Sequence, residues 1–264
     1  MSATKRLKQW LPPEVIRIGR HVTGCGPHFR GNCASWEEAC ARTEGYAAPK
    51  VLEHALQTTL AMRDDVHVTK AHLPYPLLAG LMRAAMMSRG RLRVLDFGGS
   101  LGSSYFQCRP WFHGLASLSW WVVEQPHYVD AGRAHFADDQ LMFFPSIEAA
   151  AGRGNVDVVL CSGVLQYLSA PQDIMMQAIA LKPQFIIIDR TPVIAGDADV
   201  MCIQKQGFPY PVRSSYPVRL FARDTLMTIA EKGYFLMSEF NTFEDPMGGI
   251  ARRVDLKGFI FERK

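Results

Sequence analysis

From residue 91 onward, short runs of β-forming apolar residues alternate with stretches of helical periodicity. Continuous apolar strands separated by helices are typical of a parallel sheet that is covered by helices on both faces. The sequence therefore predicts an α/β fold with a Rossmann-like, mostly parallel sheet of seven strands. The expected strands are Leu92 to Phe97, Trp120 to Glu124, Leu141 to Phe144, Val156 to Ser162, Phe185 to Asp189, Tyr234 to Phe240 and Gly258 to Glu262. The expected helices lie near residues 103–109, 126–136, 171–181 and 221–232.

The first ninety residues have helical patterns. Ser35 and Glu38 form a capping-box pattern, in which the serine caps a short helix and the glutamate reaches back toward its start. Longer helices are expected after Pro49 and after Pro74. Residues 1–90 are thus predicted to form a helical cap or interface segment in front of a main domain at residues 91–264.

Composition excludes several classes of protein. The net charge is only +4 and the basic residues are scattered, which argues against a nucleic-acid partner. No apolar run reaches the roughly 20 residues of a transmembrane helix, and the start lacks a signal-peptide pattern, so a cytoplasmic protein is expected. Residues 1–20 mix basic and apolar residues, which predicts a terminal helix docked on the protein, with peripheral membrane contact as the alternative. The six cysteines follow no metal-ligand or disulfide spacing, so reduced thiols and no metal are expected.

The strongest local signal is the segment VLDFGGSLG at residues 94–102, an apolar strand that ends in an acidic residue and turns through glycines into a helix. Glycines let the backbone approach a bound ligand, and the helix start offers N–H groups to a carboxylate. Ser100 and Ser103 stand where a dinucleotide fingerprint would have glycines, which disfavours NAD. A plain strand-to-helix turn is the alternative interpretation.

The next strand, Trp120 to Glu124, also ends in an acidic residue. Neighbouring parallel strands open onto the same crevice at their carboxyl ends, so Asp96, the glycine turn and Glu124 are expected to converge on one ligand. Glu124 could accept hydrogen bonds from two ribose hydroxyl groups.

Four motifs in this order carry a resemblance to a known family: DFGG at 96–99, VVEQP at 122–126, DVVLCSGVLQYL at 157–168 and IIIDRTP at 186–192. The chain resembles class I S-adenosylmethionine-dependent methyltransferases. More narrowly, it resembles a methyltransferase family often encoded in gene clusters for polysaccharides and other cell-surface glycans. Ser100 and the 28 residues that separate Asp96 from Glu124 depart from the general methyltransferase pattern.

The resemblance implies S-adenosylmethionine as the cofactor and residues 91–264 as the catalytic domain that binds it. The implied cofactor-binding residues are Asp96, Gly98, Gly99, Ser100, Gly102, Glu124, Gln125, Ser162 and Gly163. In this set the glycines of the turn approach the methionine part, Glu124 holds the ribose and Gln125 flanks the adenine. Ser162 and Gly163 border the sulfonium, and residues 146–147 would cover the adenine ring.

Methyl transfer from a sulfonium is an in-line displacement, so alignment of the reactants and exclusion of water matter most. A hydroxyl acceptor also needs a base, and the candidate catalytic residues are Asp189, His127 and Tyr167. Arg190 could bind an anionic substrate, although a structural ion pair with Asp189 is an equal alternative.

The segment from Arg190 to Leu220 is rich in prolines and is expected to form a lid. Its aromatic, arginine and hydroxyl side chains suit a sugar, which makes Tyr210, Arg213 and Tyr216 candidate substrate-binding residues together with Arg190. A proline-stiffened surface loop packed by its own tyrosines is the alternative.

The sequence thus favours a methyltransferase that acts on a small molecule or a glycan precursor, by O-methylation of a sugar hydroxyl. A catalytically retired methyltransferase fold that serves as a binding partner, and a nicotinamide-dependent oxidoreductase, are the competing hypotheses. A homodimer is left open by the sequence.

Overall fold

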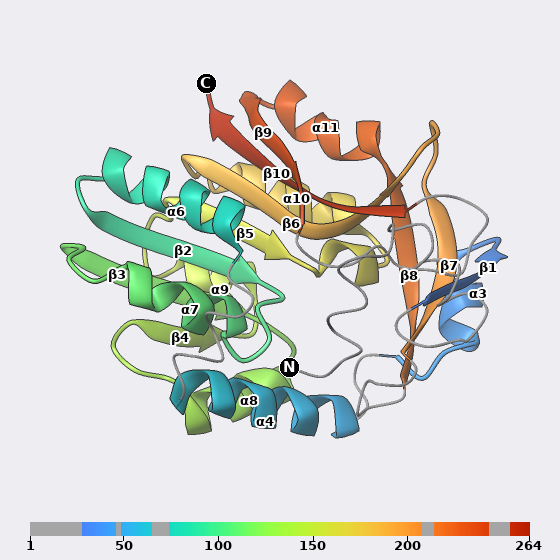
Figure 1. Ribbon diagram of the computed structural model, residues 1–264, viewed down its shortest axis with the longest axis horizontal. Helices are drawn as coiled ribbons and strands as arrows, with labels where there is room; N and C mark the ends of the chain where they lie inside the picture. The colour runs from blue at the N-terminus through green and yellow to red at the C-terminus, as the bar shows by residue number, and fades with distance from the viewer. Residues whose placement is uncertain (1–27, 46–48, 65–73, 207–213, 243–253) are drawn as a thin grey trace, which may run out of the picture.

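The computed structural model describes residues 28–45, 49–64, 74–206, 214–242 and 254–264, and the account below concerns these residues (Figure 1). Their strands form one ten-stranded sheet. Its parallel core has the order β6–β5–β2–β3–β4. These five strands are β2 (Arg91–Phe97), β3 (Ser117–Val123), β4 (Leu141–Phe144), β5 (Val158–Ser162) and β6 (Phe185–Ile194).

Two antiparallel strands complete the expected set of seven. They are β9 (Tyr234–Asn241) and β10 (Val254–Arg263). Strand β10 lies between β6 and β9 and is antiparallel to both. All seven strands predicted from the sequence are present, so the Rossmann-like, mostly parallel core is confirmed.

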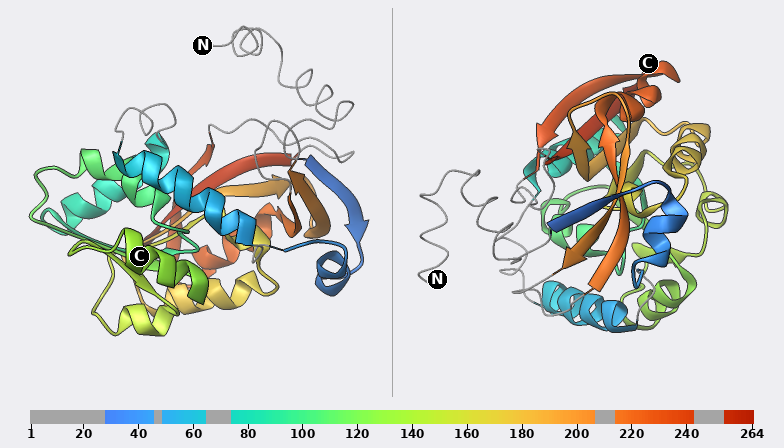
Figure 2. Two further views of the ribbon diagram at one scale, coloured as in Figure 1. Left: turned by 90° about the horizontal axis from the view of Figure 1, so that it is seen from below. Right: turned by 90° about the vertical axis from the view of Figure 1, so that its right-hand side faces the viewer.

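Strand β6 is long enough to pair with two different strands along one edge. Its first half pairs with β5, and its last two residues pair with β8 (Ser214–Ala222). Strand β8 is followed in the sheet by the antiparallel strands β7 (Val200–Gln206) and β1 (His28–Cys33), which lie at the opposite end of the molecule from β4 (Figures 1 and 2). We refer to β8, β7 and β1 as the extension. It stands beyond the carboxyl end of β5.

The segment from Arg190 to Leu220 was expected to be a lid, but most of its described residues belong to the strands β6, β7 and β8. The prolines of this segment do not prevent pairing, since Pro217 lies opposite Ile203 in the β7–β8 ladder. Burial explains the difference, because Cys202, Val218 and Leu220 pack with Phe29 of β1 in a small core of their own.

Helices cover both faces of the sheet. One face carries α6 (Tyr75–Met87), α7 (Ser103–Cys108) and α8 (Pro126–His135), with α4 (Pro49–Asp64) packed against α7. The other face carries α9 (Ile147–Ala151), α10 (Pro171–Ala180) and α11 (Arg223–Glu231). Successive residues of β3 alternate between the two cores, so Trp120 packs beneath the first group and Trp121 beneath the second. None of the described helices is long and apolar enough to cross a membrane.

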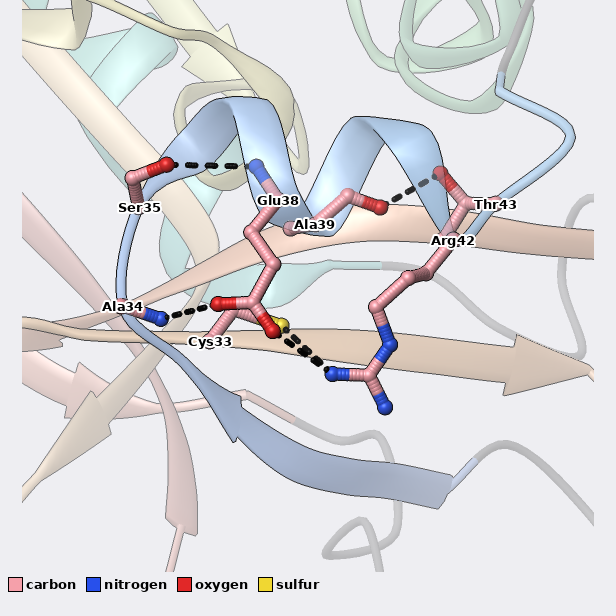
Figure 3. A network of polar contacts seen from close by, with 7 residues as sticks. All are labelled: Cys33, Ala34, Ser35, Glu38, Ala39, Arg42 and Thr43. Carbon is pink, nitrogen blue, oxygen red and sulfur yellow. Dashed lines mark hydrogen bonds and ion pairs between the residues drawn. The ribbon is translucent and has the colours of Figure 1, made fainter.

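The short helix α3 (Trp36–Ala41) begins with the predicted cap (Figure 3). The Ser35 hydroxyl accepts a hydrogen bond from the Glu38 N–H at 3.2 Å. The Glu38 carboxylate reaches back as expected, but it accepts from the N–H of Ala34 rather than of Ser35, and it also pairs with Arg42. The cap therefore fixes the turn between β1 and α3.

The N-terminal part of the chain is not helical throughout, because β1 belongs to the same sheet as the main domain. The division into a segment 1–90 and a domain 91–264 stays a prediction. The predicted terminal helix in residues 1–20 lies outside the described residues.

Replacing the cap serine tests this local structure. Ser35→Ala is expected to lower the free energy of unfolding by about 1 kcal/mol, because the first turn of α3 loses a hydrogen-bond acceptor. Ser35→Asp keeps an acceptor and should stay close to the wild-type protein. Urea unfolding measures the free energy of unfolding of both variants. Equal losses in the two would show that the cap hydrogen bond is not the source of the stabilisation.

Candidate functional site

The turn that follows β2 has no room for side chains at two of its glycines. At Gly98 the backbone has φ +70°, and an added Cβ would lie 2.2 Å from Cγ2 of Val164. At Gly99 an added Cβ would lie 2.5 Å from a carboxylate oxygen of Asp96. The predicted glycine turn therefore passes between a strand-end carboxyl group on one side and the loop after β5 on the other.

Ser100, the residue that departs from the glycine pattern, adopts the conformation that glycine favours. Its φ is 54°, in the left-handed region that is costly for a residue with a Cβ. Its N–H donates a hydrogen bond to Oε1 of Glu124 at 3.2 Å. This hydrogen bond joins the turn after β2 to the end of β3.

Glu124 is held at its place by main-chain donors from both sides. Its other carboxylate oxygen accepts from the N–H of Gln125 at 2.9 Å, where α8 begins. Burial raises the pKa of the Glu124 carboxyl, while these hydrogen bonds from Gln125 and Ser100 oppose the rise. The carboxyl group is thus oriented before any ligand arrives.

A cavity of about 450 Å³ opens at the carboxyl ends of β2, β3, β4 and β5. Several predicted cofactor residues line it, namely Gly98, Glu124, Gln125, Ser146, Ile147 and Gly163. The remaining lining residues are Phe97, Val123, Pro126, Pro145, Glu148, Val164, Tyr167, Leu168, Ile174 and Gln177. The structure therefore brings Gly98 of the glycine turn and Glu124 to one concave, largely apolar site, whereas Asp96, Gly99, Ser100, Gly102 and Ser162 are not among the lining residues.

Asp96 supports the turn from below. It has no exposed surface, and one of its oxygens accepts a hydrogen bond from the indole N–H of Trp120 at 2.9 Å. Burial raises the pKa of Asp96 to about 7, against the opposing effects of this hydrogen bond and of the Arg190 charge. Contact with the cofactor was predicted for Asp96, whereas the structure places its carboxyl group against Gly99.

Three other predicted residues form a cluster where β5 ends beside the middle of β6. The Ser162 hydroxyl donates to Oδ2 of Asp189 at 3.2 Å and accepts from Nε of Arg190 at 3.1 Å. Asp189 is only 3% exposed and lies 4.0 Å from the same Arg190 nitrogen. Arg190 has φ 52°, and its guanidinium lies beside Gly163 at the cavity wall. The Asp189–Arg190 pair that the sequence left as an alternative is present.

Tyr167 connects the cavity to the extension. It lines the cavity, and its hydroxyl donates to Gln204 of β7 at 2.8 Å. Its ring lies edge-on to that of Tyr216 of β8, with 5.8 Å between the centroids. Tyr216 is only 4% exposed, so it contributes to the packing of this wall and offers no open ring face. Tyr210 and Arg213 lie outside the described residues.

His127 is placed apart from the other two candidate bases. It occupies the first turn of α8 and is absent from the residues that line the cavity. Its Nε2 is buried, with no hydrogen-bond partner among the described residues. Within the same part of the chain, no group of three acidic, histidine or cysteine side chains could hold a metal ion.

Sequence reasoning missed some residues of the site. Val164 could have been found, because it follows Gly163 in the same loop. Ile174 and Gln177 reach the cavity from α10, and Trp120 reaches Asp96 across the sheet. Which helix packs beside the cavity, and which side chain reaches a distant carboxyl group, depends on tertiary packing. Such packing leaves no local signal in the sequence.

No family model and no curated protein matches this chain. Among solved structures, the CcbJ methyltransferase from Streptomyces caelestis is 16% identical with a TM-score of 0.43, over 70% of this chain and 89% of that one. An amino pentose methyltransferase from Micromonospora echinaspora, with bound S-adenosylmethionine, is 10% identical with a TM-score of 0.45, over 70% and 88%. Magnesium protoporphyrin IX methyltransferase from Synechocystis PCC 6803 is 13% identical with a TM-score of 0.44, over 96% and 97%. At these identities and TM-scores the similarities assign this chain neither fold, substrate nor cofactor.

Proposed function

We propose that this protein is an S-adenosylmethionine-dependent methyltransferase that acts on a small-molecule acceptor. One observation carries the proposal. The Glu124 carboxylate and the glycine turn meet at one cavity, and the Ser100 N–H holds them together at 3.2 Å. Residues 91–264 would form the catalytic domain, and residues 1–90 a cap or interface segment.

The residues present fit this cofactor. A cavity of about 450 Å³ lies within the range of roughly 300–1,000 Å³ that is usual for small-molecule sites. Glu124 offers an oriented acceptor for ribose hydroxyl groups, and apolar side chains such as Ile147 and Val164 offer a surface for an adenine ring. The missing side chain at Gly98 lets Val164 pack directly against the turn, and both residues line the cavity.

Charge also favours this cofactor over a dinucleotide. Two carboxyl groups border the glycine turn, with Asp96 beneath it and Glu124 beside it. Carboxylates repel a pyrophosphate and attract the sulfonium and ammonium groups of S-adenosylmethionine. The absence of glycine at residue 100 points the same way, as the sequence already indicated.

When bound, the cofactor would supply an electrophilic methyl group, so the chain itself has to orient the acceptor, exclude water and remove a proton. Asp189, His127 and Tyr167 remain the candidates for the last task, and Tyr167 is the one that lines the cavity. Arg190 remains a proposed residue of the acceptor side, between the cavity and the extension, whereas the buried Tyr216 would only pack behind Tyr167. We propose a sugar hydroxyl of a glycan precursor as the acceptor, which is supported by the polar Tyr167–Gln204 contact at this wall and by the family resemblance of the sequence.

Calorimetric titration tests the proposed cofactor. We expect micromolar binding of S-adenosylmethionine and S-adenosylhomocysteine and no binding of NADH. Binding of NADH alone would replace the proposal with an oxidoreductase, and binding of none of the three would contradict it.

Replacing Glu124 tests the observation that carries the proposal. Glu124→Ala is expected to weaken cofactor binding by about 1–3 kcal/mol, because a charged hydrogen-bond acceptor is lost. Glu124→Gln keeps one acceptor and should lose less. Asp130→Asn, on the exposed side of α8, is the matched control and should bind as the wild-type protein does. If Glu124→Ala lowers only the folding stability, Glu124 has a structural role.

An acceptor would first be identified by radiolabelled methyl transfer to a panel of sugar nucleotides. Steady-state kinetics with this acceptor would then distinguish the three candidate bases. Tyr167→Phe is expected to lower kcat by about 10²–10⁴, since a general base contributes this much, and to leave cofactor affinity unchanged. His127→Gln should retain the wild-type kcat, because His127 does not line the cavity. Unchanged kcat in Tyr167→Phe together with a large loss in Asp189→Asn would transfer the role to Asp189.

A further inference from the structure

Two neighbouring tryptophans of β3 have opposite surroundings. Trp120 is fully buried, and its ring lies against Tyr105 and Phe112 on the α7 side of the sheet. Its indole N–H donates to Oδ2 of Asp96 at 2.9 Å. Trp121 is almost as deeply buried on the opposite face, but its indole N–H has no hydrogen-bond partner among the described residues. Trp121 can therefore serve as the control for Trp120, because the two are adjacent and buried but only the indole N–H of Trp120 has a hydrogen-bond partner among the described residues.

The oxygen that receives the Trp120 hydrogen bond also touches the glycine turn. A Cβ on Gly99 would lie 2.5 Å from this same Oδ2 of Asp96. The other oxygen, Oδ1, is buried without a hydrogen-bond partner in the described part of the chain. The Trp120 N–H thus fixes the rotation of the Asp96 carboxyl group, and the carboxyl group in turn supports the backbone of the turn.

We propose that Trp120 is a positioning residue of the cofactor site, which orients Asp96 under the glycine turn and thereby controls the affinity for a cationic cofactor. The inference rests on the proposed function. It adds a residue that lies outside the cavity and acts only through Asp96.

The charges around Asp96 give this role a pH dependence. Burial raises the pKa of Asp96 to about 7, although the Trp120 hydrogen bond and the Arg190 charge lower it; the Glu124 charge acts in the same direction as burial. The thiols of Cys108 and Cys161, which also face Asp96, are uncharged near neutral pH because burial raises the pKa of each to about 12. Loss of the Trp120 N–H removes an interaction that favours the ionised carboxyl, so its pKa should rise further.

Titration with S-adenosylmethionine between pH 6 and pH 9, for the wild-type protein, Trp120→Phe and Trp121→Phe, tests the proposal. The affinity of the wild-type protein should increase as the pH rises through about 7, because the Asp96 carboxylate attracts the cationic ligand. Trp120→Phe should bind about tenfold more weakly at pH 7, since one hydrogen bond to a charged group is lost, and should recover at higher pH as the carboxyl ionises. Trp121→Phe should follow the wild-type protein at every pH.

A second readout needs no ligand. The unfolded carboxyl has its ordinary pKa of 3.8 and the folded one a pKa of about 7, so the unfolded chain binds fewer protons between these values. The free energy of unfolding should therefore fall as the pH rises from about 4 to about 7. In Trp120→Phe the free energy of unfolding should go on falling to a higher pH, because the pKa of Asp96 is higher in this variant. In Trp121→Phe it should stop falling at the same pH as in the wild-type protein.

The outcomes separate the two levels of the proposal. Failure of the wild-type protein to bind S-adenosylmethionine at any pH overturns the proposed function, and with it the role of Trp120 in a cofactor site. If the wild-type protein binds and the two variants behave alike, the role of Trp120 is wrong while the proposed function stands. A loss in Trp120→Phe that is the same at every pH would also overturn it, because it would reflect packing alone.

Discussion

The contact between the Asp96 carboxyl group and the backbone at Gly99 determines how the rest of the site is built. A carboxyl group buried at the end of β2 leaves no space for a side chain above it, so the chain must turn through glycine. The glycine turn directs the Ser100 N–H toward the carboxylate of Glu124. The same carboxylate accepts a hydrogen bond from the N–H of Gln125, where α8 begins. One close contact therefore sets the relative positions of two strand ends and one helix start.

The second determinant is the length of β6, which lets a parallel core and an antiparallel extension share one sheet. Because β8 continues beyond the carboxyl end of β5, the extension forms a wall next to the loop that carries Gly163 and Tyr167. Many α/β proteins place only loops above the carboxyl ends of their strands. Here hydrogen-bonded strands stand in that region, so an acceptor would meet a rigid surface on this side.

The core of the sheet and the glycine turn could be predicted from the sequence because each has a local signal. Continuous apolar runs identified all seven core strands, and a strand end followed by glycines identified the turn. The extension was missed because prolines such as Pro217 argue for a loop, while the pairing that overrides them involves β1, more than 160 residues earlier in the chain. The hydrogen bond from Trp120 to Asp96 was equally invisible, since two adjacent tryptophans in an apolar strand do not reveal which one reaches a carboxyl group. Tyr216 was expected at an exposed binding surface, but the packing of β8 against Tyr167 buries it.

The position of β10 has a consequence for the synthesis of the protein. Residues 254–263 fit between β6 and β9, both of which leave the ribosome earlier. Until these residues emerge, β6 and β9 each have an unpaired edge, and such edges are templates for aggregation. The nascent chain can thus form most of its secondary structure during translation, yet β9 joins the sheet only when β10, made near the end of the described chain, inserts between β6 and β9.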